Sequence, residues 1–154
     1  MPVEFIGFIG SNGASESHAN AGPILDVDYV ERMARAHDAG GFERALVAVG
    51  STLPDSMVLV QHAASVTERL GFMIAHRPGF IAPTYAARAL ATLDHFTRGR
   101  VAVHIITGGA DDEMARDGDH LTKSERYART DEYLEIMRQE WTSTRPFDHA
   151  GRYY

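Results

Sequence analysis

The feature that most constrains the fold is an alternation of strand and helix that repeats four times along the chain. Short runs rich in Val, Ile, Phe and Ala alternate with segments whose apolar residues recur at helical spacing. The predicted strands cover residues 3–8, 44–50, 70–75 and 100–107. The predicted helices begin near residues 28, 55, 84 and 124. Apolar strands that alternate with amphipathic helices indicate a parallel sheet covered by helices.

Two architectures fit this alternation, a doubly wound open sheet and a barrel. A dinucleotide-binding open sheet would carry Gly-x-Gly-x-x-Gly after its first strand, but Gly7, Gly10 and Gly13 are spaced by threes. The strand centres lie roughly 30 residues apart, so four units fill the chain, whereas a complete barrel needs about 250 residues. We therefore expect an α/β fold, the N-terminal half (four βα units) of a TIM (β/α)8 barrel. We expect strand order 1-2-3-4 and a single domain over residues 1–154.

Capping residues mark the ends of the predicted helices. Asp26 or Asp28 precedes the first helix, and Gly40-Gly41 ends it. Asp55 stands at the N-cap position of the second helix. Ser124 is expected to open the last helix, which carries acidic residues in its early turns.

Composition excludes several classes of function. A net charge of −6 argues against a nucleic-acid partner, because phosphates are held by clustered Lys and Arg. No apolar run reaches the ~18 residues of a membrane helix, and no signal peptide or cysteine is present, so we expect a soluble, cytoplasmic protein with no membrane partner. The eight histidines are scattered without His-x-His or His-Glu-x-x-His, so we expect no metal site. Gly-x-Ser-x-Gly is absent, which argues against a nucleophilic serine.

The predicted strand over residues 100–107 ends in an unusual way, at Thr107-Gly108-Gly109. In a barrel of parallel strands the chemistry lies at the carboxyl ends, so Thr107 is placed to enter a site. The two glycines would let the backbone approach a flat ligand closely. The same residues also suit an ordinary capped turn, and their spacing does not separate the two interpretations.

Four segments in this order and spacing carry a resemblance to a known family. They are "RP" at 77–78, "AARALATLDHFTRGR" at 86–100, "TGG" at 107–109 and "ERYARTDEY" at 125–133. Over its whole length the chain resembles the bacterial luciferase-like flavin-dependent monooxygenases, nearest the alkanesulfonate monooxygenase branch. The resemblance implies reduced FMN supplied by a separate flavin reductase, O2, and an organosulfonate or related small organic substrate. A deazaflavin in place of FMN stays open.

The resemblance also implies which residues touch the cofactor, although it assigns no catalytic residue. The implied cofactor-binding residues are Asp55, Ala75, Arg77, Thr107, Gly108, Lys123 and Tyr127. Lys123 stands where family members often carry a histidine. At the end of the third strand, near Ala75, the family often has a non-proline cis peptide bond. The residues implied for substrate access are Asn12, His18 and Leu53.

Several of these residues have an ordinary structural alternative. Asp55 can serve only as an N-cap, and Arg77 can be a surface cation. Tyr127 can pack its ring inward with a wet hydroxyl. His104, in the middle of the fourth strand, is a weaker candidate ligand, because such a histidine is more often an interior residue.

A half-barrel leaves two edge strands and an apolar inner face without partners, which favours self-association into a homo-oligomer. The strand residues concerned are Phe5, Phe8, Val101, Val103 and Ile105. The alternative function is therefore a catalytically inactive half-barrel that only self-associates or completes a barrel with a partner chain.

Overall fold

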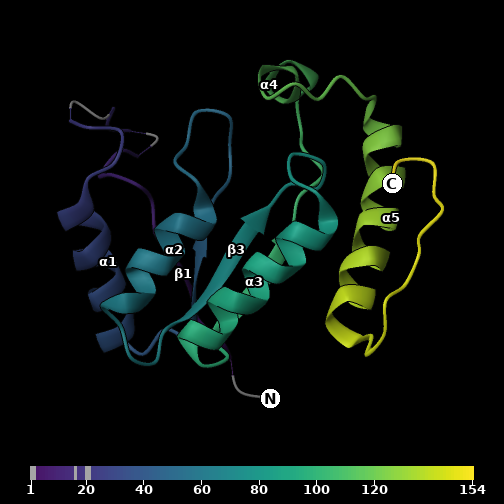
Figure 1. Ribbon diagram of the computed structural model, residues 1–154. Coiled ribbons are helices and arrows are strands. Elements are labelled where there is room, and N and C mark those ends of the chain that lie inside the picture. The colour runs from purple at the N-terminus through teal and green to yellow at the C-terminus, as the bar shows by residue number, and fades with distance from the viewer. Residues whose placement is uncertain (1–2, 16, 20–21) are drawn as a thin grey trace. The chain divides into compact units, whose positions relative to one another are not determined.

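The computed structural model describes residues 3–15, 17–19 and 22–154 (Figure 1). The strands are β1 (Ile6–Phe8), β2 (Arg44–Val47), β3 (Gly71–His76) and β4 (Val101–Ile105). The helices are α1 (Val27–Ala39), α2 (Ser56–Ser65), α3 (Pro83–Thr97), α4 (Asp111–Arg116) and α5 (Lys123–Thr142). Contacts within the chain divide it into two compact units. Unit 1 comprises Met1–His76 and Leu93–His104, and unit 2 comprises Arg77–Thr92 and Ile105–Tyr154.

The four strands form one sheet in the order β1-β2-β3-β4, which confirms the predicted order and the α/β class. β1 pairs with β2 in parallel, with Ile6 opposite Arg44. β2 pairs with β3 in parallel, with Arg44 opposite Gly71. Because these strands are parallel, the residues that follow β1, β2 and β3 lie at one edge of the sheet.

The core of unit 1 lies between the sheet and its helices. α1 packs against α2 and β2, and α2 packs against β2 and β3. Five of the six residues of β3 are buried, as expected for an inner parallel strand. The fully buried apolar side chains of this core include Ala45, Val60, Ala63, Phe72 and Ile74.

The caps of α1 and α2 follow the sequence closely. Asp26 is the N-cap of α1 and accepts a hydrogen bond from the Tyr29 N–H at 2.9 Å. Asp55 is the N-cap of α2 and accepts from the Val58 N–H at 2.9 Å. Each carboxylate satisfies an N–H that the first helical turn leaves without a partner.

The start of α5 differs from the prediction. Thr122 is the N-cap, and Ser124 lies inside the first turn, so the prediction of Ser124 is wrong. Thr122 and Glu125 form a capping box: the Thr122 hydroxyl accepts from the Glu125 N–H, and the Glu125 carboxylate accepts from the Thr122 N–H. Two N–H groups satisfied together favour this start over a single serine cap. The hydrogen bonds from Thr122 lower the pKa of Glu125.

The C-terminal segment over residues 143–154, which we call the tail, lies along α5 (Figure 1). Glu132 on α5 accepts hydrogen bonds from the N–H groups of Tyr153 at 2.9 Å and Arg152 at 3.0 Å. These hydrogen bonds lower the pKa of Glu132, and the bond from Tyr153 has the largest effect. The rings of Tyr133 and Tyr154 meet edge to face at 5.8 Å. The tail is therefore a packed part of unit 2.

Across the described ranges, none of the helices combines the length and the apolar character that a membrane span requires.

Candidate functional site

The residues implied by the resemblance divide between the two units. Unit 1 holds Asn12, His18, Leu53, Asp55 and Ala75. Unit 2 holds Arg77, Thr107, Gly108, Lys123 and Tyr127. Ala75 is the penultimate residue of β3, and the other residues follow strand ends or stand near the start of a helix.

In unit 1, the end of β3 is joined to the start of α2. The Ser56 hydroxyl donates to the Ala75 carbonyl at 2.9 Å, beside the Asp55 cap. His76, the last residue of β3, is only 5% exposed. Burial lowers the pKa of His76, and the charge of Asp55 offsets this in part. The imidazole at this strand end is therefore neutral at neutral pH.

The cis peptide bond expected at the end of β3 is not found. The described residues contain no cis peptide bond, so the expectation is wrong. β3 continues as regular strand through His76, and the Ala75 carbonyl has its hydrogen-bond partner in Ser56. The trans bond is the less costly form by about 3 kcal/mol for a residue other than proline.

In the loop after β1, the side chain of Asn12 makes hydrogen bonds to other residues of the same loop. Its side-chain amide donates to the carbonyls of Pro23 and Ile24, and its oxygen accepts from the Ala14 N–H. The His18 ring lies 2.9 Å from the Ser17 hydroxyl, and both residues are exposed. Asn12 shapes this loop, whereas His18 lies on its surface.

In unit 2, Arg77 is not a surface cation. It is 7% exposed, and its Nη2 lies 2.7 Å from Glu113 Oε1. Its Nε and Nη1 are buried, and neither has a hydrogen-bond partner within the described part of the chain. Buried N–H groups of a guanidinium are costly to leave unpaired, so Arg77 is suited to receive acceptor atoms from a ligand.

Thr107 and the two glycines after it have different surroundings. The Thr107 carbonyl accepts from Arg126 Nε at 3.1 Å. Gly108 has φ of +88°, and a Cβ there would collide with the side chain of Met114 in α4. A Cβ on Gly109 would meet nothing within 4 Å. Gly108 thus makes room for Met114, and Gly109 is the position with open space.

Lys123 and Tyr127 lie in the first turns of α5. Both residues are exposed to solvent, and the exposed fraction of Tyr127 is 54%. More than half of the Tyr127 surface is thus open to solvent, so its ring is at most partly packed. His104 in β4 is also exposed, so it is not the interior residue that the alternative described.

Sequence reasoning missed a set of arginine–carboxylate pairs in unit 2. Arg77 pairs with Glu113, Arg126 with Asp111, and Arg129 with Asp119. Two of the arginines belong to the segment "ERYARTDEY" that carries the resemblance, and the acids lie in the acidic run after Gly109. The available signal was the presence of two arginines in a segment that follows a run of acidic residues.

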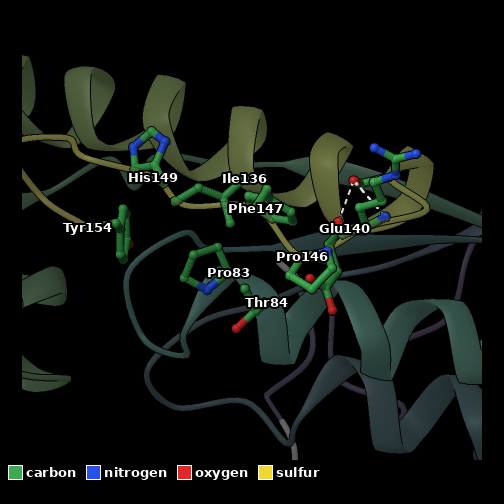
Figure 2. A pocket seen from close by; sticks show the side chains of 10 residues that line it. Pro83, Thr84, Ile136, Glu140, Pro146, Phe147, His149 and Tyr154 are labelled. Atoms are coloured by element: carbon green, nitrogen blue, oxygen red, sulfur yellow. Dashed lines mark hydrogen bonds between the residues drawn. The ribbon is translucent and has the colours of Figure 1, made fainter.

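Unit 2 also contains a cleft of about 550 Å³ beneath the tail (Figure 2). Figure 2 shows its walls, which come from the start of α3 (Pro83, Thr84), from α5 (Ile136, Glu140) and from the tail (Pro146, Phe147, His149, Tyr154). The cleft contains none of the residues implied by the resemblance. The described residues form no group of three or more His, Asp or Glu side chains that could hold a metal ion.

Solved structures of several monooxygenases are similar to this chain. An EDTA monooxygenase from Chelativorans sp. BNC1 matches with a TM-score of 0.81 and 19% identity, over 98% of this chain and 44% of that one. The oxygenating constituent of 3,6-diketocamphane monooxygenase from Pseudomonas putida, solved with FMN, matches with a TM-score of 0.79 and 21% identity, over 100% and 43%. A long-chain alkane monooxygenase matches with a TM-score of 0.69 and 27% identity, over 77% and 32%.

The chain thus spans less than half the length of these similar proteins. Its four-stranded sheet matches that portion of their luciferase-like barrels, which confirms the expected architecture. A model of the family described as luciferase-like monooxygenase matches residues 3–154. This chain therefore belongs to the luciferase-like monooxygenase family.

Proposed function

We propose that this chain is part of an FMNH2-dependent monooxygenase that oxidises an organosulfonate or a related small organic substrate with O2. The observation that carries the proposal is the family match over residues 3–154. We take residues 1–154 as one incomplete barrel domain, with reduced FMN supplied by a separate flavin reductase.

Two features of unit 2 fit a flavin ligand. Arg77 has buried N–H groups at Nε and Nη1 that lack acceptors, and a flavin offers carbonyl and phosphate oxygens. Gly109 has open space where a side chain would stand, so the backbone there allows a flat ring to approach. Thr107, Gly108, Lys123 and Tyr127 complete the proposed contacts in this unit.

The remaining proposed contacts belong to unit 1 and are described within that unit. Asp55 and Ala75 lie at the ends of the loop and strand that the Ser56 hydrogen bond joins. The proposed roles of Asn12, His18 and Leu53 are in substrate access, because they lie on loops after strand ends.

Reduced FMN, when bound, supplies the electrons that activate O2, and the protein supplies binding, orientation and exclusion of water. The N–H groups of Arg77 would hold acceptor oxygens of the cofactor at a buried position. The neutral imidazole of His76 adds no positive charge at the end of β3. Burial at this strand end also keeps water away from reacting groups.

The substrate is proposed from the resemblance alone. The similar proteins are named for EDTA, a camphane and a long-chain alkane, so the shared fold accommodates unrelated substrates. An organosulfonate is our proposal because the segments at 77–78, 86–100, 107–109 and 125–133 are nearest to the alkanesulfonate branch.

An anaerobic titration with reduced FMN tests the cofactor. We expect saturable binding that Arg77→Gln weakens, while Arg138→Gln, an exposed arginine on α5, leaves it unchanged. Sulfite release from octanesulfonate or methanesulfonate, with a flavin reductase and NADPH, tests the substrate. Binding of reduced FMN no stronger than to an unrelated acidic protein would contradict the proposal.

A second candidate function is favoured by the surface of β1. Ile6 and Phe8 in this edge strand are 48% and 53% exposed, and Phe5 just before it is 62% exposed. We propose on this ground that the chain forms a homo-oligomer, with or without catalysis. Sedimentation over a dilution series tests it, and a monomer at all concentrations would contradict it.

A further inference from the structure

One side chain joins the two ends of the segment between β4 and α5. This segment, Thr107–Leu121, contains α4, and we call it the excursion. Arg126 on α5 donates from Nε to the Thr107 carbonyl at 3.1 Å and from Nη1 to the Leu121 carbonyl at 2.7 Å. The first and last residues of the excursion are thus fixed by the same guanidinium.

The burial of Arg126 makes these two bonds important. The residue is 0% exposed, and a buried guanidinium is costly unless its N–H groups are bonded. Its ion pair with Asp111, at 2.8 Å, involves a carboxylate whose side chain is 78% exposed and therefore well screened by water. The two backbone carbonyls are accordingly the main partners of Arg126, and loss of its side chain would leave both without this donor.

Other contacts hold the middle of the excursion. Met114 in α4 is fully buried against Gly108, and Glu113 pairs with Arg77. Asp119 is buried and pairs with Arg129. Loss of Arg126 would therefore free the ends of the excursion, Thr107 above all, while α4 keeps its own anchors.

We infer that Arg126 is a positioning residue for the flavin site: it fixes the backbone of Thr107 and acts on the cofactor through that residue. This inference rests on the proposed function, in which Thr107 contacts the flavin. It assigns a specific task to one arginine of the segment "ERYARTDEY".

The test is a double-mutant cycle on the affinity for reduced FMN, measured anaerobically. We expect Arg126→Gln to weaken binding about tenfold, because Thr107 loses its fixed position. In the background of Thr107→Val, which already lacks the hydroxyl, Arg126→Gln should have little further effect. In the background of Lys123→Gln the two effects should multiply. A loss that multiplies equally with both variants would overturn the inference, because it would indicate a general structural effect.

A second measurement needs no flavin. Hydrogen exchange of the amides at 107–109 should be faster in Arg126→Gln than in the parent chain, and unchanged in Arg138→Gln. If Arg126→Gln does not fold, Arg126→Lys replaces it, with an intermediate loss expected because one ammonium cannot bond both carbonyls in the same fork. Absence of FMNH2 binding by the parent chain would overturn the proposed function and this inference with it. Unchanged exchange at 107–109 would overturn the inference alone.

Discussion

Two regions of the molecule use arginine in opposite ways. In unit 1, Arg100 precedes β4 and uses every nitrogen of its guanidinium. It donates to the Thr97 carbonyl at 2.8 Å, the Leu70 carbonyl at 2.9 Å, the Thr67 hydroxyl at 3.0 Å and the Ala64 carbonyl at 3.1 Å. In unit 2, Arg77 follows β3, and one of its three nitrogens has a hydrogen bond.

The difference agrees with the separate roles of the two ends of the strands in barrels of parallel strands. Residues at the amino ends of the strands contribute mainly to stability, and residues after the carboxyl ends contribute to chemistry. Every nitrogen of Arg100 already donates to the protein, and four of its five N–H groups are used. Arg77 keeps two nitrogens that only a further acceptor can satisfy. Incomplete hydrogen bonding of a buried cation is therefore the better indicator of a binding role.

The largest expected effect comes from Arg100→Gln. Three carbonyls lose their donor, and we expect the free energy of unfolding to fall by about 3–4 kcal/mol. Urea denaturation followed by circular dichroism measures it. Arg35→Gln is the control, because its ion pair with Glu31 is exposed and its loss should cost no more than about 0.5 kcal/mol.

Arg77→Gln sharpens the contrast. It removes one ion pair and also two unsatisfied groups, so its effect on unfolding should be smaller than that of Arg100→Gln. Equal losses of stability in the two variants would break the comparison between the regions.

A medium effect is expected from Gly108→Ala. The new methyl group must adopt φ near +88° and displace Met114, and together these should cost about 2–3 kcal/mol. Gly118→Ala is a matched control in the same excursion, with φ of +86° and open space around its Cβ, so it should cost about 1 kcal/mol. Urea denaturation of both variants measures the difference. Similar costs would show that Met114 moves aside freely.

Local sequence patterns were sufficient to predict the order of the strands and the start of α2. The strand–helix alternation predicted the order of the sheet, and Asp55 marked the start of α2. Both are local signals, because periodicity and capping depend on residues within a few positions of one another. The start of α5 was misplaced by two residues because Thr122 and Ser124 are both suitable caps, and only the Glu125 side chain decides between them.

Contacts between distant residues could not be predicted in the same way. α4 has six residues, too few for a clear helical period, and it is held by Met114 and Glu113. The burial of Arg126 depends on carbonyls 19 and 5 positions away in the chain. An arginine in an amphipathic helix is normally exposed, so its sequence position predicted the opposite of what the structure shows.

The smallest expected effect concerns His76 at the end of β3. Burial lowers the pKa of His76 below its ordinary 6.5, and the nearby Asp55 charge opposes this. The unfolded chain therefore binds a proton more readily than the folded chain, and stability is lost as pH falls from above 6.5 toward the lower folded-state pKa. The slope from this residue is at most about 1.4 kcal/mol per pH unit.

His76→Asn should flatten the dependence of the unfolding free energy on pH between about 7 and 5, whatever its effect on stability at neutral pH. Asp55→Asn separates the two influences on the imidazole. Asparagine still caps α2, but the charge that supports protonation of His76 is gone, so the loss of stability should extend to lower pH. Urea denaturation at a series of pH values measures both slopes. Parallel curves for the parent chain and His76→Asn would contradict this prediction, because they would show that the imidazole at this strand end titrates as it does in the unfolded chain.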